Sequence, residues 1–301
     1  MSEYADITIN NLSLMSFRNY LVPDIVSLFF SKSDLIITPN YRIDLEDEDT
    51  EGYTRYIYKT TVKKAKERLD ALGFGVSNFE NVFNSNLLQA IDYSAFLQHL
   101  RVDFDDREEI ALERCKKRVT FKKWMNAMHK IISYELENGN IRWHNTNGSI
   151  AINTECEKII YHAQKDGDTE SYYGIFTEFV DVAYIFRIIL ENCDDSYDIV
   201  LDFSYLQYWA EDCIPKALLA TDDIEKTIVL VEGTSDKDIL EFAISKIYPH
   251  LSDLFYFMDF DDATGAKRDG GTSYVVKNLK TFYFSKLNSK SAVLNFICAN
   301  V

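Results

Sequence analysis

The last quarter of the chain alternates between apolar runs and helical patterns, and this alternation restricts the fold more than any other feature. Thr227–Val231, Leu254–Met258 and Ala292–Val301 have the composition of strands. Helical patterns at Asp236–Ile247 and Thr272–Leu287 lie between them. Strands that alternate with helices favour right-handed crossovers and a parallel sheet. The segment therefore predicts a parallel βαβαβ unit.

The first of these strands ends at a carboxylate followed by a glycine. Glu232 and Gly233 come directly after the apolar run, and Thr234 or Ser235 is expected to cap the next helix through its hydroxyl. Open α/β sheets bind ligands at the carboxyl ends of their strands. Glu232 is therefore a candidate for a functional site, and a solvated carboxylate at a strand end is the alternative.

A second acidic group follows the next strand. Asp259 and Asp261 would lie on the same side of an extended chain. Two such carboxylates repel each other unless a proton or a cation lies between them, and Mg²⁺ prefers oxygen ligands. The alternative is an acidic turn that leads into a glycine-rich loop. Asp236 suits the positively polarised first turn of its helix, which is a purely structural role.

Upstream of this unit, the clearest pattern is an amphipathic helix. Val62, Ala65 and Leu69 recur at spacings of three and four, and Gly73 stands where a left-handed C-cap belongs. The outer face of this helix is expected to carry basic side chains, namely Lys59, Lys63, Lys64, Lys66 and Arg68.

The rest of the first 222 residues contains mostly helical patterns. Short strands are expected at 5–9 and 198–203, and a loop at 34–52. Further helices are expected at 17–30 (interrupted or begun at Pro23), 82–101, 107–136, 155–165, 172–192 and 205–219. The predicted class is α+β, with a mainly helical N-terminal domain over residues 1–222 and a partial α/β domain over residues 223–301, the boundary falling in the polar stretch 220–226.

Composition narrows the class of protein. The net charge of −16 repels nucleic acid as a whole, so binding to a phosphate backbone requires a local basic patch or bound cations. The cysteines are odd in number (5) and show no CxxC spacing, which fits a reducing compartment. No apolar run is long enough for a membrane span, and the first residues lack a secretory signal. We expect a cytoplasmic protein with no membrane partner.

One basic segment stands out in this acidic chain, from Arg114 to Trp124. Phe121 and Trp124 could stack on bases while the cations meet phosphates. The alternative is a solvated helix face, with Val119 and Trp124 turned toward the core. The candidate nucleic-acid-binding residues are Arg114, Lys116, Lys117, Arg118, Lys122 and Lys123.

The run from Val229 to Asp236 resembles the first motif of the Toprim domain, which topoisomerases, bacterial primases and the overcoming-lysogenization-defect nucleases share. The resemblance implies Mg²⁺-dependent phosphodiester cleavage at DNA or RNA. It implies that Glu232 is the metal-linked acid or base and that Asp236 is a secondary ligand. Asp259 and Asp261 match the Asp-x-Asp sequence pattern of the family's metal ligands.

The N-terminal region adds a second resemblance. Tyr4–Ile9 and Thr60–Phe74 resemble bacterial proteins with a HEPN/Toprim N-terminal domain. Such proteins join a largely helical domain to a C-terminal Toprim, and the resemblance implies a role in phage defence.

The sequence departs from the motifs of these families in two ways, and both change the activity that we expect. The family's Asp-x-Asp follows the third strand, whereas Asp259 and Asp261 follow the second and the chain ends on the third. We therefore expect a truncated Toprim whose cleavage is weak or absent. HEPN ribonucleases carry an Arg and a His separated by four to six residues, and none of the five histidines has an Arg at that distance upstream.

Two functions stay open at this point. One is a nucleic-acid-processing Toprim protein that uses Mg²⁺. The other is a non-catalytic module that binds nucleic acid or a protein. Either could form a homo-oligomer or act with a partner from a defence system.

Overall fold

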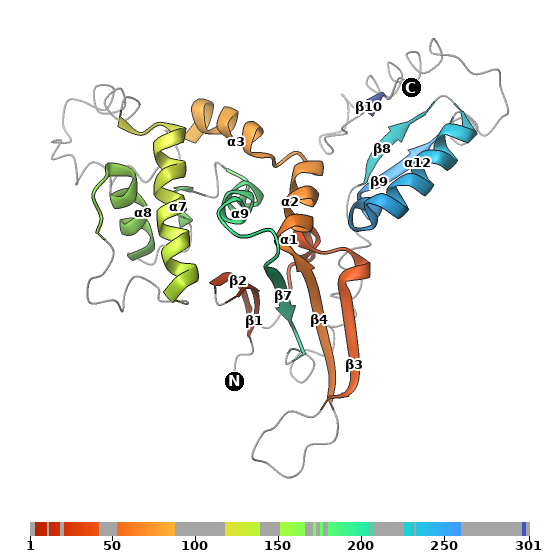
Figure 1. Cartoon of the computed structure of the whole chain (residues 1–301), viewed down its shortest axis with the longest axis horizontal. Helices are drawn as coiled ribbons and strands as arrows, with labels where there is room; N and C mark the ends of the chain where they lie inside the picture. The colour runs from red at the N-terminus through yellow and green to blue at the C-terminus, as the bar shows by residue number, and fades with distance from the viewer. Residues whose placement is uncertain are drawn as a thin grey trace.

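A computed structural model describes the protein over residues 4–10, 12–18, 21–41, 53–87, 118–138, 151–165, 171–172, 175–176, 180–204, 206, 226–231, 233–259 and 297–298. The chain forms an N-terminal region built on an antiparallel sheet and a smaller C-terminal unit built on a parallel sheet (Figure 1). Within the described residues, no helix combines the length and the apolar character that a membrane crossing requires.

The N-terminal sheet has five strands in the order β2-β1-β7-β4-β3. All its pairings are antiparallel, and β7 lies between β1 and β4, with Leu201 opposite both Ile7 and Tyr58. A strand from late in the domain therefore closes a sheet whose other strands come from the first 61 residues. The strands are β1 (Tyr4–Ile9), β2 (Leu12–Arg18), β3 (Leu35–Tyr41), β4 (Tyr53–Thr61) and β7 (Asp198–Asp202).

Helices pack around this sheet and beside it. Contacts join α1 to α2, α2 to α9, and α7 to both α8 and α9. The helices are α1 (Pro23–Phe29), α2 (Val62–Ala71), α3 (Val76–Val82), α7 (Phe121–Asn138), α8 (Glu155–Lys165) and α9 (Val182–Glu191). Shorter elements are the 3₁₀ turn η1 (Lys32–Asp34), the π-helical turn η2 (Phe83–Leu87), and the small hairpin of β5 (Ser171–Tyr172) and β6 (Ile175–Phe176).

The main hydrophobic core lies between the sheet and α9. Seven of the ten residues of α9 are buried, which explains why its sequence is apolar almost all round. Phe186 packs on Phe29 with ring centroids 5.0 Å apart, and Tyr58 stacks on Phe203 at 5.6 Å. A second aromatic cluster joins α3, η2 and α7 through Phe79, Phe83, Phe121 and Trp124.

The C-terminal unit has a three-stranded parallel sheet in the order β10-β8-β9. The helix α12 covers one face, where Leu240 and Ile244 pack against Val229, Val231 and Phe257. The elements are β8 (Thr227–Leu230), α12 (Thr234–Ile247), the 3₁₀ segment η4 (Pro249–Leu254), β9 (Phe255–Met258) and β10 (Ile297–Cys298). The parallel α/β arrangement predicted from the alternating pattern is confirmed for these elements.

Several local predictions for the N-terminal region are also confirmed. The helix α2 has Val62, Ala65 and Leu69 buried, and Gly73 has a φ of 94°, the left-handed C-cap conformation. The helix α1 begins at Pro23, α8 spans 155–165, and β7 falls where a strand was expected.

The prediction of a mainly helical N-terminal domain was incomplete because it missed β2, β3 and β4 of the sheet and both strands of the small hairpin. Phe17 lies in β2 rather than in a helix, and β3 occupies part of the region expected to be a loop. The helix expected from residue 172 begins at Val182, after the small hairpin. Strand pairing brings together residues distant in sequence, so short strands leave weak local patterns. The helices expected at 205–219 and 272–287 lie wholly or almost wholly outside the described residues, as do residues 107–117 of the helix expected at 107–136 and residues 88–101 of the helix expected at 82–101.

Candidate functional site

The carboxyl end of β8 is the point where the parallel sheet changes direction. The chain leaves β8 toward β9 on one side, and β10 lies on the other side. Loops that diverge from a central strand leave a crevice at its carboxyl end, and ligands bind there in open α/β sheets. The amide of Val231 donates to the carbonyl of Met258 at 3.0 Å, which joins the ends of β8 and β9.

Asp259 lies at this junction. It follows Met258, the last residue of β9, and its side chain is buried, with a residue exposure of 4 %. A carboxylate is buried only where polar or charged groups compensate it, and a buried acid at the end of a parallel strand is a functional candidate because ligands bind at that edge of the sheet. Glu232 is the next residue after Val231 in the chain, and both Glu232 and Asp261 lie outside the described residues.

The turn between β8 and α12 brings a second carboxylate toward the same end of the sheet. Gly233 is the N-cap of α12, and its carbonyl accepts the amide of Asp236 at 3.1 Å. A Cβ built on Gly233 would lie 3.6 Å from Oδ2 of Asp236, so this carboxylate folds back over the turn. The hydroxyl capping expected from Thr234 or Ser235 is wrong, because α12 has no side-chain cap.

The described carboxylates fit only part of a metal site. Asp236 and Asp259 offer hard oxygen donors, which suit Mg²⁺. No group of three or more His, Cys, Asp or Glu side chains within the described residues is arranged to hold a metal ion. A complete donor set would therefore need Glu232 or Asp261.

The basic segment is part surface and part core. Arg118 pairs with Glu155 at 3.2 Å, and Nζ of Lys123 donates to the carbonyl of Arg118 at 3.1 Å. Lys122 and Lys123 are exposed at the start of α7, while Arg114, Lys116 and Lys117 lie outside the described residues.

The aromatic residues of that segment are not available to nucleic acid. Trp124 is 1 % exposed and packs against Phe79 and Phe83, and Phe121 is also buried. The prediction that these two rings could stack on bases is wrong. The alternative, in which Val119 and Trp124 face the core, is confirmed.

A buried polar junction connects α2 to η4, the segment that leads into β9. The guanidinium of Arg68 donates to the carbonyls of Ser27 and His250, both at 2.7 Å. It also donates to both carboxylate oxygens of Asp253, at 2.6 and 2.5 Å. Nε2 of His250 lies 2.7 Å from Oε2 of Glu67.

This junction corrects the prediction that Arg68 lies on an outer basic face. Arg68 is only 1 % exposed. The signal was present in the spacing: Arg68 is three residues after Ala65 and one before Leu69, so it borders the buried stripe of α2. Its long side chain reaches past the helix to a segment whose position no local pattern predicts.

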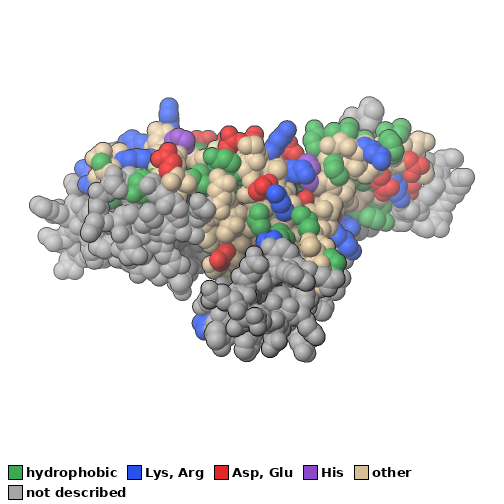
Figure 2. All heavy atoms as spheres, turned by 60° about the horizontal axis from the view of Figure 1, so that its bottom comes forward, with side chains coloured by type: hydrophobic (Ala, Val, Ile, Leu, Met, Phe, Trp, Pro, Cys, Tyr) green, Lys and Arg blue, Asp and Glu red, His purple; other side chains and the backbone are tan. Residues whose placement is uncertain are grey.

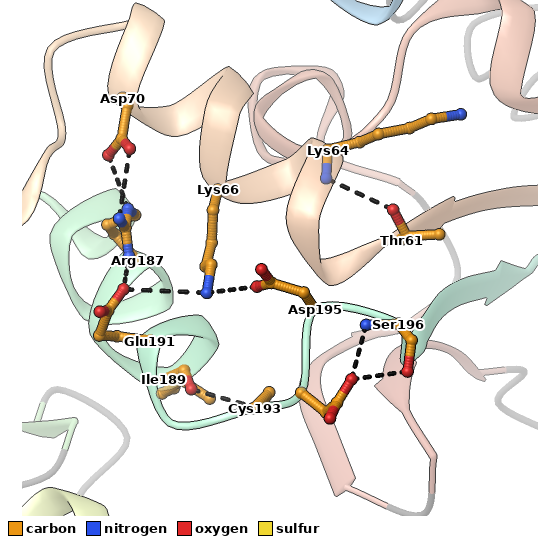
Figure 3. Close-up of polar contacts among 11 residues, drawn as sticks. Thr61, Lys64, Lys66, Asp70, Arg187, Ile189, Glu191, Cys193, Asp195 and Ser196 are labelled. Atoms are coloured by element: carbon orange, nitrogen blue, oxygen red, sulfur yellow. Dashed lines mark hydrogen bonds and ion pairs between the residues drawn. The ribbon is translucent and has the colours of Figure 1, made fainter.

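The other side of α2 carries a charge network that holds α9 (Figure 3). Arg187 donates to Asp70 and to Glu191, at 2.6 and 2.7 Å, and Lys66 pairs with Asp195 at 2.6 Å. Burial disfavours the charged form of Arg187, but its hydrogen bonds to the two carboxylates outweigh burial and raise the pKa of Arg187 above its ordinary value. Both sides of α2 therefore carry polar contacts, one toward α9 and one toward η4.

Comparison with known proteins identifies one family. A family model described as HEPN/Toprim N-terminal domain 1 matches residues 1–222. No curated protein and no solved structure shows detectable similarity to the chain.

Proposed function

The chain belongs to the HEPN/Toprim N-terminal domain 1 family, and from this premise we propose that it processes nucleic acid through its C-terminal unit. Membership of the family suggests nucleic-acid processing. The finer proposal is a Toprim-type, Mg²⁺-dependent cleavage of phosphodiester bonds in phage defence.

One observation carries this proposal: a buried carboxylate, Asp259, directly follows β9, the strand next to the central strand of the parallel sheet. In the sequence, Glu232 comes directly after Val231, which follows the central strand β8. The amide of Val231 donates a hydrogen bond to Met258 at the end of β9. Acidic residues that follow neighbouring parallel strands supply oxygen donors at the same edge of a sheet.

In the proposed site, Glu232, Asp236, Asp259 and Asp261 would hold the cation. When bound, Mg²⁺ supplies neutralisation of phosphate charge and activation of a water molecule. Glu232 would take the proton of the attacking water, as a general base does. Burial of Asp259 would keep its carboxylate in place and shielded from bulk water.

The experiment measures Mg²⁺ affinity and cleavage together, on single-stranded DNA, double-stranded DNA and RNA. Glu232→Gln and Asp259→Asn are expected to weaken Mg²⁺ binding by tenfold or more, since each removes a charged ligand (~1.4 kcal/mol per tenfold). Asp238→Asn is the matched control, because Asp238 is an exposed carboxylate in α12, the helix that also carries Asp236. Cleavage is expected to be slow, because the aspartate pair follows the second strand rather than the third. Mg²⁺ affinity that is unchanged in both variants would refute the proposed site.

A binding module without catalysis is the second candidate, and the exposure of Lys122 and Lys123 favours it. Contact with phosphates would then release counterions, so affinity would fall steeply with salt. Charge reversal across Lys116, Lys117, Lys122 and Lys123 separates the two functions. Lost nucleic-acid binding with unchanged Mg²⁺ affinity would favour the module.

A further inference from the structure

The outer face of α12 presents apolar side chains to solvent. Ile239 and Phe242 are 65 % and 66 % exposed, whereas Leu240 and Ile244 of the same helix pack against the sheet. Hydrophobic side chains gather on the surface of the C-terminal unit, at the right of the space-filling view, with basic side chains among them (Figure 2). An exposed apolar cluster rimmed by charges is typical of an interaction site.

The charges on this face are arranged symmetrically about Phe242. Asp238 stands four residues before it and Lys246 four residues after it, and both are exposed. Residues four apart share a face of a helix, so the three side chains form one row. Nζ of Lys246 lies 5.8 Å from the centroid of the Phe242 ring. Neither Asp238 nor Lys246 makes an ion pair in the part of the chain that is described.

We propose that α12 is a self-association surface that pairs with α12 of a second copy in antiparallel orientation, with Phe242 at the twofold axis. An acid, a ring and a base at equal spacings are self-complementary under that symmetry. Asp238 of each copy then meets Lys246 of the partner subunit, and the two rings meet at the centre. A twofold interface requires this kind of self-complementary patch.

The size of the contact between the two α12 helices determines how tightly the dimer is expected to form. A helix of 14 residues is about 21 Å long. One helix pair of that length falls at the small end of protein interfaces, so we expect a weak dimer, with a Kd on the order of 10 µM. The pairing does not depend on the proposed cleavage, because none of the proposed ligands belongs to the row of Asp238, Phe242 and Lys246.

The first test is sedimentation of the complete chain over concentrations on the order of 1–200 µM. The wild-type protein should shift from monomer to dimer. Phe242→Glu should abolish the shift, because two glutamates would then meet at the axis. Ile247→Glu is the matched control: Ile247 has nearly the same exposure (65 % against 66 %) on the same helix, and helical spacing turns it about 140° from Phe242. Circular dichroism verifies that both variants fold.

A charge swap then tests the orientation. Asp238→Lys and Lys246→Asp should each weaken the dimer about tenfold, because each replaces two attractive pairs with two repulsive ones. The double variant should recover wild-type affinity. A chain that stays monomeric throughout, an Ile247→Glu variant as defective as Phe242→Glu, or a double variant that does not recover would overturn the proposal.

Discussion

Arg68 on α2 and Asp253 on η4 form a bidentate ion pair, although 185 residues separate them in the chain. Arg68 belongs to the family-matched domain, and Asp253 lies beyond it, two residues before β9. The pair therefore fixes the N-terminal domain against the strand that leads to Asp259. Because the guanidinium is buried, four of its N–H groups bond to protein atoms in place of water.

Removing this guanidinium should destabilise the protein strongly. Arg68→Met keeps the volume but leaves Asp253 and two carbonyls without their donor, and breaking a buried pair in this way costs about 3–5 kcal/mol. Lys64→Met, at an exposed position of the same helix, should change stability by less than about 0.5 kcal/mol. Urea unfolding followed by circular dichroism measures both. Equal stability of the two variants would contradict the junction.

Two adjacent threonines at the end of β4 should respond differently to replacement by valine. Oγ1 of Thr60 is buried and has no hydrogen-bond partner in the part of the chain that is described, so Thr60→Val should be neutral or stabilise by up to about 1 kcal/mol. Oγ1 of Thr61 accepts the amide of Lys64 at the start of α2, so Thr61→Val should destabilise by about 1 kcal/mol. Thermal unfolding compares the two variants directly, and an equal loss of stability in both would contradict the prediction.

Glu157 should stabilise the folded protein at neutral pH, and this stabilisation should disappear at acidic pH. Burial alone would raise its pKa, but the amides of Asn153 and Thr154 and the ammonium of Lys130 outweigh burial, and the pKa of Glu157 lies below its ordinary value. A lowered folded pKa means that the stabilisation is complete above the unfolded pKa and disappears as pH falls through the folded one. Glu157→Gln should therefore destabilise by about 1–2 kcal/mol at pH 7, and this deficit should shrink progressively as the pH falls below the ordinary glutamate pKa of 4.5.

The control for this pH dependence is Glu137→Gln, at an exposed position near the end of α7. Stability of this variant should follow the wild-type curve at every pH. A Glu157→Gln deficit that stays constant as the pH falls would show that the loss comes from packing rather than from the carboxylate charge.

Two buried thiols should resist alkylation in the folded protein. Burial raises the pKa of Cys193 to about 12 and that of Cys156 to about 11, so little thiolate exists at neutral pH. We expect both to react at least on the order of 100-fold more slowly in the native protein than in urea. Mass spectrometry of peptides after iodoacetamide treatment measures each cysteine separately. Alkylation rates in the native protein that match those in urea would show that the two thiols are accessible to solvent.

Local patterns in the sequence were sufficient for elements whose stability is local. The buried stripe of α2 and its left-handed Gly73 follow from helical periodicity and from the freedom of glycine at positive φ. The order of β8, α12 and β9 follows from apolar runs separated by an amphipathic helix. Part of the candidate site follows as well, since Asp259 was expected at the end of a strand and lies there.

The sequence by itself therefore determined the family, the main helices and the parallel character of the C-terminal unit. Only the tertiary structure decided that β7 lies between β1 and β4, that Arg68 is buried against η4, and that Phe121 and Trp124 belong to the core. The physical reason is the range of the forces involved. Helical periodicity acts between residues three and four apart, whereas sheet order and buried ion pairs depend on partners that the chain supplies more than a hundred residues away.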